Sequence, residues 1–164
     1  DDYFNKPIVI ALALIVYGIA FIYIERAHKN VEPKINDFKE LDFMTAIKIG
    51  LFQCLALVPG TSRSGSTILG GLLVGTSRSI ATEFSFFMGI PIMFGASGLK
   101  LLKFGFHYSL AEFVILLVGS VVSFVVSLFV IKFLLKYIKH HDFQAFGWYR
   151  IALGIIVLGS LFFK

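Results

Sequence analysis

The chain has 164 residues, of which 57% are hydrophobic and only 15% are charged, and its formal net charge is +5. Soluble domains are about 45–50% apolar, so this excess, gathered in long runs, indicates an integral membrane protein and argues against a soluble all-α protein. The basic residues flank apolar runs and form no basic face with aromatic side chains, so we expect no nucleic-acid partner. The single Cys54 excludes a disulfide within the chain.

Four apolar segments are long enough to cross a hydrocarbon core of about 30 Å as helices. They are residues 7–24, 80–102, 110–135 and 146–163. Between the first two, residues 25–42 form a polar stretch in which Pro33 and Asn36 oppose a helix, so it is predicted to be a surface loop.

Residues 43–79 differ from these spans, because two short apolar pieces flank the polar turn PGTSRSG at 59–65. The second piece, residues 66–75, forms about 15 Å of helix, which is half of the hydrocarbon core. Irregular backbone at that depth is tolerated only where it is buried in protein or lines a cavity. We therefore predict a re-entrant helical hairpin that enters and leaves on one side, with residues 62–64 near the membrane midplane.

The distribution of lysine and arginine gives the orientation of this arrangement. The positive-inside rule makes the side that holds the 25–42 loop cytoplasmic, because it carries most of the basic residues. That side holds Arg26, Lys29, Lys34, Lys39, Lys48, Arg78, Lys132, Lys136, Lys139 and Arg150, whereas the other holds Lys6, Lys100, Lys103 and Lys164.

Arg63, which belongs to neither side, needs a specific explanation. An arginine near the bilayer centre is costly and usually faces a cavity or a partner. A helix begins directly after it, and a helix N-terminus, hydroxyl groups and a guanidinium together suit a phosphate. The alternative is a polar turn with Ser64 as the N-cap and Arg63 reaching to water. The hydroxyl-bearing and small residues around it are Gly60, Ser62, Ser64, Gly65, Ser66 and Thr67.

The letters GTSRS occur twice, at residues 60–64 and 75–79. In the second copy Gly75 is expected to end one helix, Ser77 or Ser79 to cap the next, and Arg78 to be an ordinary cytoplasmic charge. The two copies are therefore predicted to differ in role because they lie at different depths.

Other candidate residues are weaker. Glu83 in the first turn of a helix is explained by the helix dipole, although a role near the phosphate turn stays open. Gly71 and Gly75 form a GxxxG pattern that favours close helix packing. The sequence places no histidine or carboxylate pair at metal-ligand spacing and no base beside Arg63, so it predicts an electrophilic half-site only.

Residues 52–67, FQCLALVPGTSRSGST, closely resemble the PGxSRSGxT signature of the undecaprenyl-diphosphatase family, the bacitracin-resistance membrane phosphatases of bacteria. The stretches EFSF at 83–86, GIP at 89–91 and YR at 149–150 also resemble the family pattern. The resemblance covers essentially the whole chain but only the C-terminal part of the family's proteins.

The resemblance implies an all-α integral membrane fold of two inverted repeats, each with a re-entrant hairpin and three spanning helices. The chain then contains the last span of the first repeat (1–25), a cytoplasmic loop (26–42), the hairpin with its phosphate-binding turn (43–79) and three spans that complete the second repeat (80–164). The family's acidic motif and its Ser-Ser-Thr-Gly-His turn do not occur here. The nucleophile or base, and the acids tied to a divalent cation (Mg or Ca), are therefore expected in the missing first repeat, with no metal ligands in this chain.

The function implied by the resemblance is hydrolysis of undecaprenyl diphosphate to undecaprenyl phosphate and phosphate, which recycles the cell-wall lipid carrier at the bacterial cytoplasmic (inner) membrane. Arg63 is the expected catalytic group. The expected partners are a polyprenyl diphosphate lipid, the bilayer, the N-terminal repeat and, as an open option, a second copy in a homodimer. The residues expected to bind the diphosphate are Ser62, Arg63, Ser64, Gly65 and Thr67.

A second function from another class remains open at this point. Half-helix ends that bind anions at the midplane are typical of transporters, so a lipid-phosphate flippase or an anion transporter would use the same turn. A third reading, a purely structural membrane bundle, leaves Arg63 unexplained.

Overall fold

The computed structural model describes residues 7–105 and 109–162, and the regular elements in that part of the chain are helices. Lys6 and Lys164, which belong to the predicted charge count, and the end of the last predicted span lie outside the described residues. The α-helices are α1 (Pro7–Ala27), α2 (Phe43–Gln53), α3 (Arg63–Val74), α4 (Arg78–Phe104), α5 (Leu110–Ile138) and α6 (Gln144–Phe162), and the 3₁₀ helices are η1 (Phe38–Glu40) and η2 (Cys54–Leu57).

Four helices, α1, α4, α5 and α6, are long and apolar enough to cross a membrane, which confirms the four predicted spans. α1 continues to Ala27, beyond the predicted end of the span at Ile24, and the charged Glu25 in this last turn is paired inside the protein. The apolar window of α5 contains no buried residue, so apolar side chains are exposed along the helix. An outward apolar surface of this kind is what a bilayer requires of a spanning helix.

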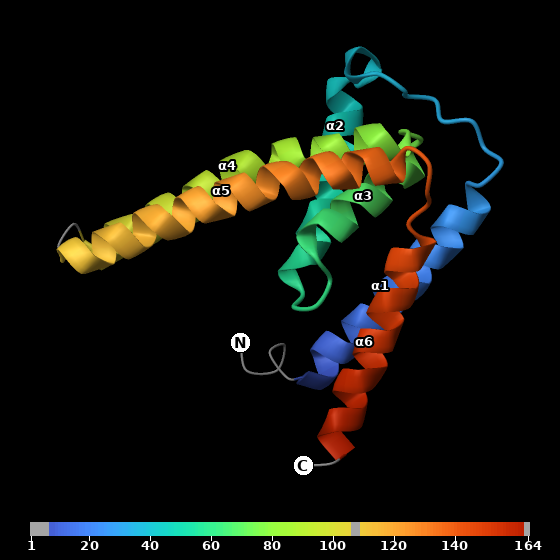
Figure 1. Ribbon diagram of the computed structural model, residues 1–164. Coiled ribbons are helices and arrows are strands. Elements are labelled where there is room, and N and C mark those ends of the chain that lie inside the picture. The colour runs from blue at the N-terminus through green and yellow to red at the C-terminus, as the bar shows by residue number, and fades with distance from the viewer. Residues whose placement is uncertain (1–6, 106–108, 163–164) are drawn as a thin grey trace.

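The helices are arranged as three antiparallel pairs (Figure 1). α1 runs along α6, and α4 with α5 forms a long hairpin that extends away from them. α2 and α3 form a shorter hairpin between these two pairs, and α3 contacts both α1 and α4. A small apolar core lies where α1, α3, α4 and the end of α5 meet. It consists of Phe21, Ile68, Leu69, Leu72, Ala81, Ile138 and Phe143.

Glycines set the close approach of α1 and α6. A Cβ on Gly18 would lie 2.7 Å from the carbonyl oxygen of Gly147, and one on Gly147 would lie 2.7 Å from the carbonyl of Gly18. Seven residues along each helix, a Cβ on Gly154 would lie 2.9 Å from the carbonyl of Ala11. Small residues allow such backbone contact between membrane helices, where van der Waals packing drives association.

The polar loop between α1 and α2 is fixed in its middle and at its C-terminal end. The amide of Ile35 donates to the carbonyl of Gly75, and the amide of Ser77 donates back to the carbonyl of Ile35 at 2.9 Å, so the loop is attached to the α3–α4 junction. At the start of α2, the Asp42 carboxylate accepts from the amide of Thr45 at 2.9 Å. Hydrogen bonds from Thr45 lower the pKa of that carboxyl.

Candidate functional site

The turn that joins η2 to α3 has an unusual backbone. Gly60 has φ of +94°, and a Cβ there would lie 2.8 Å from the carbonyl oxygen of Ile10 on α1, so both conformation and space require glycine. Ser62 has φ of +59° and is the single positive-φ non-glycine residue in the described part of the chain. Such conformations persist only where the surroundings enforce them, and they gather at functional sites.

Thr61 fixes the turn from within. Its side chain is buried, and its hydroxyl lies 2.8 Å from the carbonyl of Val58 and 3.0 Å from that of Leu55. The turn is therefore closed onto the preceding 3₁₀ helix.

Hydroxyl groups hold the first turn of α3. Ser62 is the N-cap, because its hydroxyl oxygen accepts from the amide of Gly65 at 3.3 Å, so the alternative with Ser64 as the cap is wrong. Ser66 donates its hydroxyl to the carbonyl of Ser62, and Thr67 donates to that of Arg63 at 2.9 Å. The hydroxyl proton of Thr67 is thus engaged in a hydrogen bond within the helix, whereas Ser64 faces a cavity.

Arg63 extends from the start of α3 toward α4. Its Nη1 donates to the carbonyl of Ser85 at 3.2 Å. A Cβ built on Gly89 of α4 would lie 2.7 Å from its Nη2. The half-buried guanidinium borders a cavity of about 930 Å³ between α4 and α5, which Glu83 also lines. The remaining lining residues are Phe86, Phe87, Gly89, Ile90, Met93, Phe94, Phe124, Ser127, Ile131 and Leu135.

The predicted diphosphate-binding residues do not all line one cavity. Ser62, Ser64 and Gly65 line a second cavity of about 410 Å³, on the side of α3 toward the end of α5 and the start of α6. The guanidinium of Arg63 and these serines therefore lie on different sides of the first turn of α3, and Thr67 is fully buried. Aromatic side chains dominate the wall of this second cavity: Phe21, Phe86, Tyr137, Phe143, Phe146 and Tyr149.

The two GTSRS copies lie at different positions along α1. Gly60 in the first copy contacts α1 at Ile10 and Ala13, whereas Arg78 in the second copy contacts it at Glu25. The rise of an α-helix makes this separation about 18–22 Å, somewhat more than the ~15 Å expected from the length of α3. As predicted, Gly75 ends α3 in a left-handed conformation and Ser77 caps α4.

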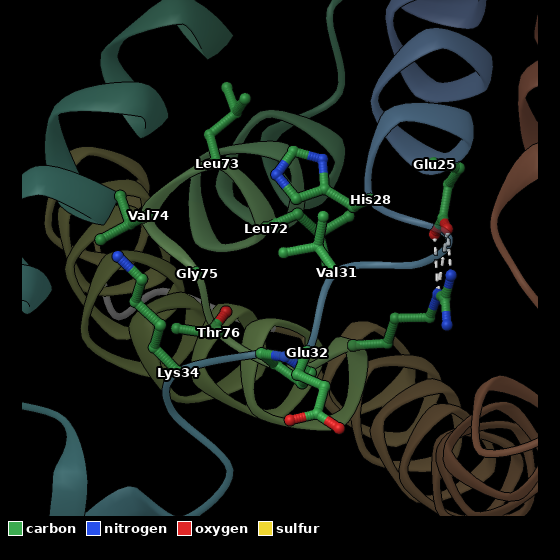
Figure 2. Close-up of a pocket in the computed structure, with 12 residues that line it drawn as sticks. Glu25, His28, Val31, Glu32, Lys34, Leu72, Leu73, Val74, Gly75 and Thr76 are labelled. Atoms are coloured by element: carbon green, nitrogen blue, oxygen red, sulfur yellow. Dashed lines mark hydrogen bonds and ion pairs between the residues drawn. The ribbon is translucent and has the colours of Figure 1, made fainter.

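Arg78 is not the ordinary cytoplasmic charge that the sequence predicts. Its Nε lies 3.0 Å from both carboxylate oxygens of Glu25 and its Nη2 contacts the same group, as the dashed lines at Glu25 in Figure 2 mark. Glu25 is only 1% exposed. Glu25 also accepts from the amide of Phe143 at 3.1 Å. A buried carboxylate requires such partners. The pair borders a cavity of about 300 Å³ at the end of α3, away from Arg63.

Arg150 contacts the turn at residues 59–65, and the sequence did not predict this contact. It was assigned to the cytoplasmic charges, but its side chain is 3% exposed and its Nη2 donates to the carbonyl of Gly60 at 2.6 Å. The guanidinium carbon lies 5.8 Å from the ring centre of Tyr17 and 5.9 Å from that of Phe146. The available signal was an arginine inside an apolar segment, which by itself suggests a specific partner.

No group of three His, Cys, Asp or Glu side chains suited to holding a metal ion occurs in residues 7–105 and 109–162. The described residues therefore offer no such group for the divalent cation that the resemblance implies.

Comparisons with known proteins identify the family. The family described as bacitracin resistance protein BacA matches residues 1–156. Undecaprenyl-diphosphatase 1 of Clostridioides difficile (strain 630) is 59% identical over 99% of this chain and 58% of its own length. The undecaprenyl-diphosphatase of Enterococcus faecalis (strain V583) is 54% identical over 100% of this chain and 60% of its own length. That of Streptococcus mutans (strain UA159) is 58% identical over 96% of this chain and 57% of its own length. The chain thus spans less than two thirds of the length of these curated relatives. The match along nearly all of its residues shows that the chain belongs to the BacA family.

Proposed function

We propose that this chain is part of a membrane phosphatase that hydrolyses undecaprenyl diphosphate to undecaprenyl phosphate and phosphate, in the recycling of the bacterial cell-wall lipid carrier at the cytoplasmic membrane. The observation that carries the proposal is the place of Arg63, at the start of α3 and on an apolar cavity between two long apolar helices. The family match and the printed names of the relatives supply the substrate and the reaction.

The proposed membrane arrangement makes α2 and α3 a re-entrant hairpin. If α1 crosses the bilayer, a turn about 18–22 Å along it from Glu25 lies inside a hydrocarbon core of about 30 Å. Backbone that is neither helix nor barrel is tolerated there only against protein or a cavity. The contacts of Gly60 with α1 and with Arg150 on α6 support this arrangement, and the chain then forms one half of an inverted-repeat fold.

The proposed role of Arg63 is to bind the diphosphate and stabilise the charge that develops on phosphoryl transfer. A guanidinium presents several donors in a plane that matches phosphate oxygens, and preorganised donors act most strongly away from water. Ser62 and Ser64 are proposed as further diphosphate ligands, although they line the second cavity and Arg63 borders the first. Gly65 lines the same cavity as the two serines, and Thr67 acts indirectly by holding the carbonyl of Arg63.

Replacement of Arg63 tests the function. In the full-length polypeptide, Arg63→Ala is expected to lower the rate of phosphate release from undecaprenyl diphosphate about 10²–10³-fold, which is the usual loss when a transition-state donor is removed. Arg63→Lys should recover only part of the rate, because an ammonium lacks the planar fork. Arg26→Ala is the matched control, since Arg26 is exposed and donates to the side chain of Gln144.

Two outcomes would contradict this function. Near-normal turnover of the Ala variant would remove Arg63 from the chemistry. Movement of the lipid phosphate across vesicle membranes by the wild type, without phosphate release, would favour the flippase or anion transporter.

A further inference from the structure

Arg150 is a buried cation with an incomplete set of partners. Its side chain is 3% exposed, its Nε makes no hydrogen bond, and within the described residues it forms no ion pair with a carboxylate. Burying an unpaired charge is costly, so an arginine in this position needs compensating contacts. The contacts present are one carbonyl oxygen, that of Gly60, and the faces of Tyr17 and Phe146.

The carbonyl that Arg150 binds belongs to Gly60, where backbone conformation and space both require glycine. Gly60 has positive φ, and the backbone of Ile10 on α1 leaves no room for a Cβ there. Its carbonyl oxygen accepts a hydrogen bond from Arg150 on α6. The turn thus contacts both helices of the α1–α6 pair. Ser62, with its own positive φ, and Arg63 follow directly, so their positions depend on how firmly Gly60 is fixed.

We propose that Arg150 is a positioning residue of the phosphatase: its hydrogen bond to the Gly60 carbonyl fixes the turn that places Ser62 and Arg63. The role rests on the proposed function and adds a residue 90 positions away in the chain. Small displacements matter at such a site, because misplacing a reacting group by about 1 Å lowers rates about 10²-fold.

The test compares Arg150→Met and Arg150→Lys in the full-length polypeptide, with undecaprenyl diphosphate in detergent micelles. The Met variant keeps apolar contact with the two rings but cannot donate to Gly60. Its kcat is expected to fall at least about 10-fold while KM changes less than about threefold, since a misplaced turn weakens the transition state more than binding. The Lys variant should have an intermediate kcat, because its ammonium donates but is shorter and lacks the fork.

Ile151→Ala is the matched control for a merely structural effect. Ile151 is next to Arg150 in sequence and packs on Gly18 in the α1–α6 interface. Its truncation should lower the thermal midpoint but leave kcat per folded molecule unchanged. If Arg150 only joins α1 to α6, the Met variant will behave in the same way, and that result overturns the proposal.

Two further results keep the test decisive. If the Met variant does not fold, the Lys variant decides: a lower kcat at an unchanged thermal midpoint supports the proposal, and an unchanged kcat overturns it. If the wild type releases no phosphate, the proposed function fails separately. Amide hydrogen exchange at residues 60–62 then decides, because it should accelerate in the Arg150 variants and not in Ile151→Ala.

Discussion

Gly89 determines where the guanidinium of Arg63 can lie. The residue is in the middle of α4, where glycine is otherwise unfavourable, and its missing side chain leaves the space that Nη2 occupies. A Cβ would come within 2.7 Å of Nη2 and 3.0 Å of Nη1. Because the guanidinium is the end of a flexible side chain, it would move rather than force the helices apart.

We therefore expect Gly89→Ala to separate activity from stability. Phosphate release should fall about 10-fold or more, because the guanidinium is displaced by around 1 Å. The free energy of unfolding should stay the same or rise by up to about 1 kcal/mol, since alanine is the better helix former. Gly98→Ala on the same helix is the control, as nothing lies within 4 Å of its added Cβ. Parallel assays of phosphate release and thermal unfolding check this, and wild-type activity in Gly89→Ala would contradict it.

At the scale of elements, α2 and α3 approach each other very closely at Gly70. A Cβ on Gly70 would lie 2.6 Å from the side-chain Cβ and Cγ of Phe52, so the two helices approach as closely as a glycine allows. In the GxxxG pattern, Gly71 packs on Ala81 of α4, whereas Gly75 is the helix cap. The pattern thus serves two purposes, and helix packing accounts for only one of its glycines.

Gly70→Ala should weaken the hairpin. Overpacking of this kind costs about 1–3 kcal/mol, so the thermal midpoint should fall, and phosphate release should fall with it because the turn moves. Gly50→Ala on α2 is the matched variant: its nearest neighbour is the end of the Met88 side chain at 3.8 Å, so it should be neutral or stabilising. Equal thermal midpoints for the two variants would show that the close approach does not limit stability.

The elements were largely predictable because their signals are local. Apolar length alone predicts the four spans, and Gly75 and Ser77 mark a helix end and a helix start through their own backbone and hydrogen-bonding properties. The partners of Arg78 and Arg150 were not predictable, because Glu25 and Gly60 lie 53 and 90 residues away. A charge near the end of an apolar run looks the same in sequence whether it faces water or a buried carboxylate.

For the whole molecule, Glu25 connects three parts of the chain at one end of the helices. Its carboxylate lies on α1, binds Arg78 at the start of α4, and accepts from the amide of Phe143 before α6. The first GTSRS turn lies about 18–22 Å nearer the start of α1, where Gly60 packs on α1 and its carbonyl accepts from Arg150 of α6. Stability at one end and the proposed chemistry at the other are therefore expected to respond to different substitutions.

Arg78→Ala tests this division. The substitution leaves the buried Glu25 carboxylate without its cation, so the free energy of unfolding should fall by about 3 kcal/mol. This loss is at the low end for a buried ion pair, because the Arg78 side chain is 36% exposed. In the double variant Glu25→Gln with Arg78→Met the loss should be smaller, since no charge is buried and the glutamine oxygen can still accept from Phe143. Thermal unfolding of the single and double variants measures the difference. In both variants, phosphate release per folded molecule should stay near that of the wild type. If Arg78→Ala lost as much phosphate release as Arg63→Ala, the two ends of the molecule would not be independent.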